Sequence, residues 1–380
     1  MKFKSAIYIL LFTSLWLVNP FITSLLILMI SLIYPYKPLI IVFGVLLSIY
    51  YGFVSYSMDS VGDFLNYKEN ITDVINNGLD FSIRGGEFGY YLIVSIVGFF
   101  LDDSVEMTHG TMLIIANLIL FIFLYKINHR RSIFIFLLLQ LFSVLVINPY
   151  LSRQFLAVSI ILYSLSLNKG KSVLWIASIL IHFSSILYMC VLLMSRKILR
   201  NKRVVLISIF TSLFLFFTMN LDMFKVVLNQ NILPEFIKVK ADFYLRMQDS
   251  EQKLDVFVVV FCIFTFFLKY KSCNTQYSEM EENILNLFFI SAILCLSFIN
   301  LPVLPTRLGY LTYYLSPLLL VFILRENKFN MLNAINLVFL CFCILIATYK
   351  IYLNDFSEPW LSLSDGDIIT RELLFYINRL

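Results

Sequence analysis

Charged side chains are scarce in this sequence. They account for 14% of its 380 residues, against about a quarter in an average soluble domain. The net charge is +5, but the basic residues are scattered among short segments and form no tract suited to nucleic acid. We therefore expect neither an ordinary soluble protein nor a nucleic-acid partner.

Signature motifs of several enzyme classes are also missing. The sequence has no GxxxxGK[ST] phosphate loop, no HExxH or CxxC metal motif and no GxSxG nucleophile elbow. Its six cysteines lie mostly within apolar stretches and lack metal-ligand spacing, as is typical of packing residues. We therefore expect no metal, no cofactor and no nucleotide hydrolysis.

Hydrophobic residues are abundant, at 60% of the chain with a mean hydropathy of +0.86. Apolar runs of about 14 to 20 residues recur along most of the length, close to what a helix needs to cross ~30 Å of hydrocarbon. They lack the alternation of barrel strands, and open sheets cannot span lipid. The sequence predicts an all-α integral membrane protein, a bundle of about 11–13 transmembrane helices with some short or re-entrant. The expected spans are about 5–18, 20–34, 38–56, 88–101, 110–126, 132–147, 154–167, 172–194, 204–219, 256–268, 284–300, 308–324 and 331–350.

The predicted domain organisation is simple. Residues 1–350 form one polytopic membrane domain with long outer loops at 57–87 and 220–255, and residues 351–380 form a C-terminal tail on the outer face. Orientation follows from charge, because Lys and Arg favour the cytoplasmic side. An N-terminus inside and eleven crossings give 17 basic and 4 acidic residues inside, against 12 and 20 outside.

This topology requires that two apolar spans dip into the membrane without crossing it. Span 88–101 is short, and span 172–194 has basic clusters at both ends, which a simple crossing would leave on opposite sides. Backbone breaks at membrane depth occur only where they are buried in protein or line a wet cavity. An extra crossing elsewhere would also remove the conflict.

Two isolated arginines stand at predicted outer helix starts. Arg153 lies in NPYLSRQFLAV and Arg307 lies in LPTRLGYLTYY. Snorkelling explains many such arginines. However, the guanidinium fork suits phosphate oxygens, and a helix N-terminus also attracts anions. The pair predicts an outward-facing anion site that could hold a lipid pyrophosphate.

Several acidic residues and one histidine are further candidates. Asp59 and Asp63 precede a tyrosine in the first outer loop, and Glu87 stands before the next apolar run. A solvated loop residue is the alternative for Asp59, and a helix cap is the alternative for Glu87. His182 lies mid-span, where ionisable groups usually face a cavity or a partner. A neutral core histidine bonded to a neighbouring helix is its alternative.

The second outer loop contains an amphipathic pattern. Phe236, Val239 and Phe243 recur at helical spacing, opposite Lys238 and Lys240. This predicts a helix lying on the outer membrane surface. An interfacial anchor and a substrate lid both fit.

The motifs GDFLNY, GEFGYYLI, SRQFLAVSIILYSL, IHFSSILY and TRLGYLTYY follow one another over residues 50–325. In this order and spacing the sequence resembles the EpsG/Wzy-type polysaccharide polymerases. The resemblance implies a GT-C-like membrane fold and a metal-independent glycosyltransferase. It would act at the outer face of the bacterial cytoplasmic (inner) membrane, with undecaprenyl-pyrophosphate-linked oligosaccharide as donor and acceptor. The resemblance also implies contact with membrane lipid and allows a chain-length regulator as partner.

The resemblance also implies residue roles. Arg153 and Arg307 would clamp the pyrophosphate leaving group, and His182 would hold or activate the reacting groups. Asp63 or Glu87 would accept the proton of the attacking hydroxyl. The expected substrate-binding residues are Asp59, Tyr67, Tyr90, Gln154, Lys238, Tyr244 and Tyr310.

Other functions remain alternatives on the residues alone. A flippase or transporter for lipid-linked oligosaccharide would use the same outer cations but should also present an inner site. An O-antigen ligase has nearly the same chemistry. A membrane acyltransferase would want a His pair or a His-Asp pair within the membrane, where only His182 is available.

Overall fold

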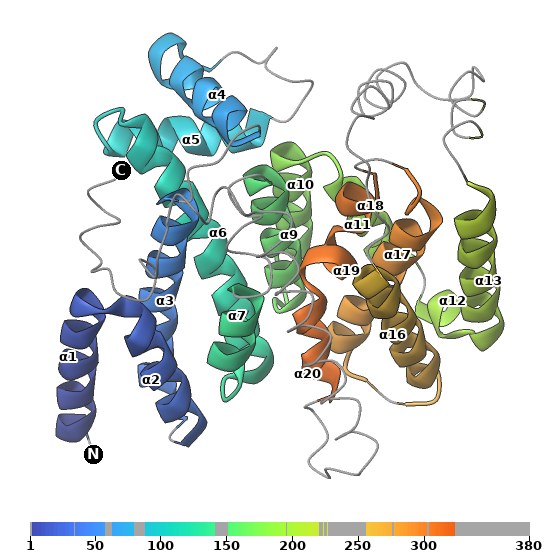
Figure 1. The fold of residues 1–380 in the computed structure, drawn as a ribbon, viewed down its shortest axis with the longest axis horizontal. Coiled ribbons are helices and arrows are strands. Elements are labelled where there is room, and N and C mark those ends of the chain that lie inside the picture. The colour runs from blue at the N-terminus through green and yellow to red at the C-terminus, as the bar shows by residue number, and fades with distance from the viewer. Residues whose placement is uncertain are drawn as a thin grey trace. The chain divides into compact units, whose positions relative to one another are not determined.

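The structure is a computed structural model, and every element in its described part is helical (Figure 1). The described residues are 2–33, 35–57, 63–79, 88–140, 151–194, 196–219, 223, 226, 256–275, 277–301 and 304–323. The chain divides into two compact units, residues 1–186 with 320–380 and residues 187–319. The all-helical prediction is therefore confirmed for the described residues.

The first unit is built around a helix that is buried on nearly all sides. Every residue of α9 is buried except Arg153 and Tyr163, which is the pattern of a core helix rather than a surface one. Its neighbours are α6 and α10, and α6 also packs along α3. The unit contains α1 (Lys2–Val18), α2 (Pro20–Ile33), α3 (Lys37–Ser57), α4 (Asp63–Asn77), α5 (Phe88–Phe100), α6 (Val105–Asn128), α7 (Ser132–Leu139), α9 (Ser152–Leu165), α10 (Lys171–Ile181) and α20 (Leu320–Ile323).

Small residues and buried polar pairs fix how these helices pack. A Cβ on Gly52 of α3 would lie 3.0 Å from the backbone of Ile114 of α6, so the glycine permits a close approach of the two backbones. Gln140 donates to Asn117 across α6 and α7 at 2.6 Å. Trp175 of α10 donates to Ser164 of α9 at 2.8 Å. These bonds satisfy polar groups that would otherwise be buried at a cost.

The three longest described helices of the second unit are α13 (Lys202–Thr218), α16 (Val256–Ser272) and α17 (Glu279–Ser297). Their mutual faces hold an apolar cluster that includes Val205, Cys262 and Phe289. The unit also contains α12 (Arg196–Arg200), α18 (Leu304–Leu308), α19 (Tyr310–Tyr314) and the 3-10 helix η2 (Ser316–Leu319). Helix α11 (Ser185–Leu193) carries the chain from the first unit into the second.

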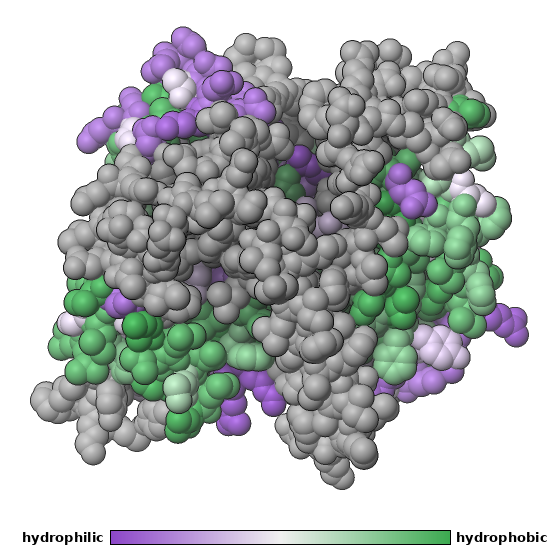
Figure 2. All heavy atoms as spheres, in the orientation of Figure 1, coloured by the Kyte–Doolittle hydropathy of each residue, from purple (hydrophilic) through white to green (hydrophobic). Residues whose placement is uncertain are grey.

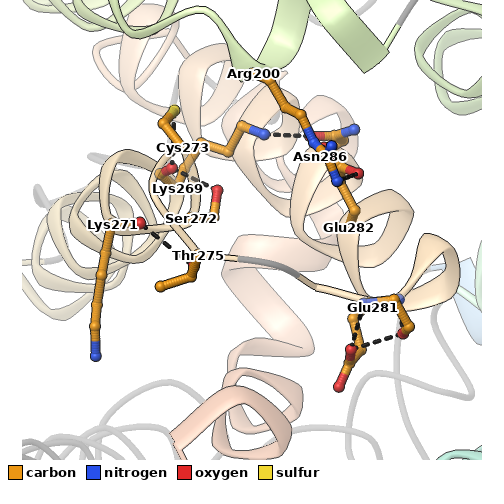
Figure 3. Close-up of polar contacts among 10 residues, drawn as sticks. Arg200, Lys269, Lys271, Ser272, Cys273, Thr275, Glu281, Glu282 and Asn286 are labelled. Atoms are coloured by element: carbon orange, nitrogen blue, oxygen red, sulfur yellow. Dashed lines mark hydrogen bonds and ion pairs between the residues drawn. The ribbon is translucent and has the colours of Figure 1, made fainter.

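Polar contacts tie one end of the second unit together (Figure 3). Arg200 donates through Nε and Nη2 to the two carboxylate oxygens of Glu282, at 2.6 and 2.7 Å. This bidentate contact raises the pKa of the Arg200 guanidinium above its usual value. Lys269 of α16 donates to Asn286 of α17 at 2.6 Å. Segment 196–203 therefore lies at the same end of the unit as the start of α17 and the end of α16.

Large apolar side chains remain exposed on both units. On α13 the exposed residues Ile207, Phe210, Phe214 and Phe217 follow helical spacing, and Phe217 is 80% exposed. Figure 2 shows such hydrophobic surface over the described helices of each unit. Two described helices, α6 and α17, are long and apolar enough to cross a membrane, and shorter apolar helices accompany them.

One predicted span is wrong as a continuous helix. The expected run 308–324 is divided among the end of α18, α19, η2 and α20, with interruptions at Gly309 and at Leu315. A Cβ on Gly309 would lie 2.6 Å from the carbonyl oxygen of Pro305 and 2.8 Å from Sγ of Cys295. The segment is thus folded tightly onto α17 rather than extended beside it.

Candidate active site

Arg153 lies among tyrosines in the first unit. Its Nε donates to the hydroxyl of Tyr67 at 3.3 Å. Its Cζ lies 5.1 Å from the centre of the Tyr67 ring and 5.9 Å from that of Tyr91. Both distances fall within the range of cation–π attraction. Three residues far apart in sequence therefore meet around one guanidinium, and we call Tyr67, Tyr90, Tyr91, Ser152 and Arg153 the Arg153 cluster.

Helix starts and ring contacts position this cluster. Arg153 is the second residue of α9 and is partly exposed, whereas the residues on either side of it are buried. The Tyr90 hydroxyl, at the start of α5, lies 3.2 Å from Oγ of Ser152. The Tyr67 ring lies 6.1 Å from the Tyr90 ring. The starts of α5 and α9 are therefore joined beside the guanidinium.

Helix α4 supplies Tyr67 and lies within the segment 57–87 that was predicted to be an outer loop. Tyr67, Ile71 and Val74 are buried and spaced by four and three residues, the pattern of an amphipathic helix. Asp63 is the first residue of α4, and its side chain lies outside the described part of the chain. The 67/71/74 spacing was the signal that could have revealed this helix.

Three members of the environment were missed by sequence reasoning. Tyr91 and Ser152 are neighbours of predicted residues, and His109 is not among the predicted site residues. His109 is fully buried, with its ring 6.1 Å from that of Tyr67. Only the structure shows that α6 carries His109 to this place, because no local pattern links residue 109 to residue 67.

His182 stands at a helix break. It follows the last residue of α10 with φ −153° and ψ 120°, and α11 begins three residues later. Its N–H donates to the Ser178 carbonyl at 2.9 Å, and its carbonyl accepts from Ser185 at 3.0 Å. The structure thus divides 172–194 into two helices at His182, whereas the predicted dip into the membrane stays a prediction.

The end of α10 lies against the start of α5. A Cβ on Gly89 would lie 2.9 Å from the carbonyl carbon and the Cβ of Leu180. This approach brings the segment leading to His182 against the residue that precedes Tyr90. Predicted residues from two separate motifs therefore share one neighbourhood within the first unit.

Arg307 and Tyr310 belong to the second unit. The prediction that Arg307 starts a helix is wrong, because it lies partly exposed in the last turn of α18. Tyr310 is buried at the start of α19 with its ring 5.2 Å from Tyr314. The backbone of Thr312 donates to Oγ of Ser291 at 3.1 Å, which holds α19 on α17. The joint clamp of Arg153 and Arg307 stays a prediction.

The remaining predicted residues divide into two groups. Gln154 is 1% exposed and follows Arg153 in α9. Asp59, Glu87, Lys238 and Tyr244 lie outside the described residues. In the described ranges, no group of three or more His, Cys, Asp or Glu side chains could hold a metal ion.

The chemistry that this arrangement supports is anion binding. A guanidinium at a helix N-terminus adds its charge to the positive end of the helix dipole, so both attract a negative group. Tyrosine rings hold the guanidinium plane without neutralising it. A phosphate or pyrophosphate is the ligand whose oxygens match such a fork.

The comparisons with known proteins agree with the motif resemblance. No curated protein and no solved structure matches the sequence significantly. The sequence model of the EpsG family matches residues 39–363, a stretch that includes every candidate residue named above. Because this match covers well over half of the chain, the protein belongs to the EpsG family.

Proposed function

We propose that this protein is a membrane-embedded glycosyltransferase that polymerises oligosaccharide repeat units carried on undecaprenyl pyrophosphate. Membership of the EpsG family supports a role in polysaccharide polymerisation and a lipid-linked saccharide substrate. The observation that carries the specific reaction is the Arg153 cluster, a cation held by Tyr67 and Tyr91 at a helix start. The product is a surface polysaccharide such as an O-antigen, a capsule or an exopolysaccharide.

The proposed reaction is a direct displacement at the anomeric carbon. A hydroxyl of the acceptor's terminal sugar forms the new bond, and the bond from the donor's anomeric carbon to the pyrophosphate oxygen breaks. The hydroxyl proton passes to Asp63 or Glu87, and the leaving pyrophosphate gains negative charge. Arg153 offsets that charge as it develops, which lowers the barrier more than it strengthens ground-state binding.

The other candidates take supporting roles in this proposal. His182 holds or activates the reacting groups from the helix break, and Arg307 completes the clamp on the pyrophosphate. Tyr67 accepts a hydrogen bond from Nε of Arg153 and so orients the guanidinium. Because Tyr90, Gln154 and Tyr310 are 1% exposed or less, we expect them to support the walls of the site. Asp59, Lys238 and Tyr244 are proposed to line the substrate path.

The proposed location is the bacterial cytoplasmic membrane, with a GT-C-like bundle of eleven crossings and the active site outward. The exposed aromatic face of α13 supports contact with lipid, because soluble monomers rarely expose large apolar patches. The Arg200–Glu282 contact supports the predicted sidedness. Segments 196–203 and 269–283 are both expected inside, and this ion pair requires that they meet at one end.

The test uses purified protein in detergent with lipid-linked repeat units. Arg153→Ala should lower kcat by about 10²–10³, the effect of losing one charge-stabilising donor. Arg153→Lys should restore little, because an ammonium lacks the planar fork. The matched control is Lys126→Ala. Lys126 lies 4.4 Å from the Tyr163 ring at the opposite end of α9, so its loss should leave polymerisation intact.

Gene deletion separates the alternatives. A polymerase mutant should leave single repeat units attached to the lipid core. Complete loss of surface sugar would favour a flippase or a ligase instead. An Arg153→Ala protein with full activity would refute the proposed role of the cluster.

A further inference from the structure

We propose that Glu106 and His109 of α6 are positioning residues that hold Tyr67 of α4 against Arg153. This inference rests on the proposed function, since it concerns the geometry of the same guanidinium. Neither residue was a candidate from the sequence, and neither contacts Arg153 through the interactions described above. They act through α4.

Two adjacent residues of α4 meet two residues one turn apart on α6. Lys68 Nζ lies 2.8 Å from Oε1 of Glu106. The Tyr67 ring lies 6.1 Å from the His109 ring, with 48° between their planes. Residues three apart on a helix share a face, so Glu106 and His109 present one continuous surface to α4.

The ion pair and the ring contact differ in how far their side chains are exposed to water. The Lys68 and Glu106 side chains are 40% and 35% exposed, so their ion pair is partly screened by water. His109 is fully buried and Tyr67 is 4% exposed, so the ring contact excludes water. The ring contact supplies the larger share of the docking, and the ion pair fixes the rotation of α4 at its rim.

Helix α4 depends on docking for its position. Its 15 residues are near the length at which an isolated helix is only marginally stable. Among the described side chains of α4, the buried apolar residues besides Tyr67 are Ile71 and Val74, both C-terminal to the two contacts. The Tyr67–Lys68 pair contacts α6 at the part of α4 that reaches Arg153, and a rotation there would move the phenol oxygen away from Nε.

The consequence for catalysis is specific. A misplaced Tyr67 leaves the charge of Arg153 intact but loosens the orientation of its fork. The anionic substrate still binds, because the charge of Arg153 is unchanged. The charge that develops only in the transition state is stabilised less, because that stabilisation depends on the orientation of the fork. The variants should therefore lower kcat with little change in KM.

The first experiment measures kcat and KM on purified protein with the lipid-linked repeat unit. Glu106→Ala and Lys68→Ala should each lower kcat about two- to fivefold, the scale of a half-exposed ion pair. The double variant should be no worse than either single one, because the two residues act as one pair. His109→Ala should lower kcat about two- to tenfold and His109→Phe should restore it, because the ring is what acts.

The second experiment measures directly whether α4 stays docked on α6. In a cysteine-free, active version of the full chain, Ile71→Cys places a thiol on the buried face and Asp73→Cys places one on the exposed face. In detergent, N-ethylmaleimide should label position 73 rapidly and position 71 slowly. His109→Ala should speed labelling at position 71 and leave position 73 unchanged. Val74→Cys replaces Ile71→Cys if the latter fails to fold.

The outcomes distinguish this inference from the proposed function. If Arg153→Ala is inactive but His109→Ala exposes position 71 without lowering kcat, the positioning role is overturned and the proposed function stands. If His109→Phe is as impaired as His109→Ala, positioning through the ring is overturned. If Arg153→Ala is fully active, the proposed function itself fails.

Discussion

Replacing Gly89 with alanine should damage activity more than stability. Gly89 begins the contact between α5 and α10, and an added Cβ would lie 2.9 Å from the carbonyl carbon and the Cβ of Leu180. Ordinary contact begins near 3.4 Å, so the two helices must separate by about half an ångström. Overpacking of this kind costs about 1–3 kcal/mol. The higher helix propensity of alanine offsets about 1 kcal/mol of this cost.

The expected net loss of stability is therefore small, at about 0–2 kcal/mol. Activity should fall further, because the strained contact lies between Tyr90 on one helix and His182 beyond the other. Misplacement by 1 Å can cost about a hundredfold in rate, so half an ångström should cost roughly tenfold. The assay is polymerisation rate at matched protein level, together with thermal denaturation in detergent.

The same helix offers a matched control. At Gly98 the nearest atom to an added Cβ is Cγ1 of Ile75 at 3.4 Å, which is ordinary contact. Gly98→Ala should therefore leave the rate unchanged and raise stability by up to about 1 kcal/mol. Equal rates for Gly89→Ala and Gly98→Ala would refute the claim that the approach of α5 to α10 positions the site.

Three further predictions concern stability, each measured by thermal denaturation of the purified protein. Arg200→Ala leaves the 3%-exposed Glu282 without its bidentate partner; because Arg200 is half exposed, we expect a loss of about 1–3 kcal/mol rather than the full cost of a buried pair. Asn117→Leu should cost about 1–3 kcal/mol by leaving the Gln140 amide unpaired, and adding Gln140→Leu should recover much of it. Gly170→Ala should cost about 1 kcal/mol through its φ of +78° alone, since its Cβ would meet nothing within 4 Å.

The individual site residues could be predicted from the sequence better than the contacts between them. Arg153, Tyr67 and Tyr90 were each candidates because of residue type and place in a motif. That they meet depends on α4, whose mean hydropathy is low because buried Tyr67, Ile71 and Val74 alternate with polar residues. A low hydropathy predicts a loop as readily as a helix. His109 was missed for a related reason. The ring of His109 contacts Tyr67 on another helix, and the periodicity within one helix cannot predict a contact between two helices.

A break in an apolar span could be predicted only where the charges that flank the span conflict with a straight crossing. Basic clusters flank 172–194, so a straight crossing conflicted with the positive-inside rule, and α10 does end at Ile181. The run 308–324 has no flanking conflict of this kind. Its interruptions depend on Gly309 folding onto Cys295 and on the turn that begins at Leu315, which an average over hydropathy cannot detect.

The setting of Arg153 itself favours a role in anion binding. A cation at a helix N-terminus opposes the helix dipole at a cost of about 0.3–1 kcal/mol, and the surrounding residues of α9 are buried. Contacts with the rings of Tyr67 and Tyr91 offset this cost by about 0.5–1 kcal/mol each. Unlike a carboxylate, a ring holds the guanidinium without cancelling its charge. The ring contacts therefore hold the guanidinium at the helix start, where its charge and the helix dipole both attract a negative group.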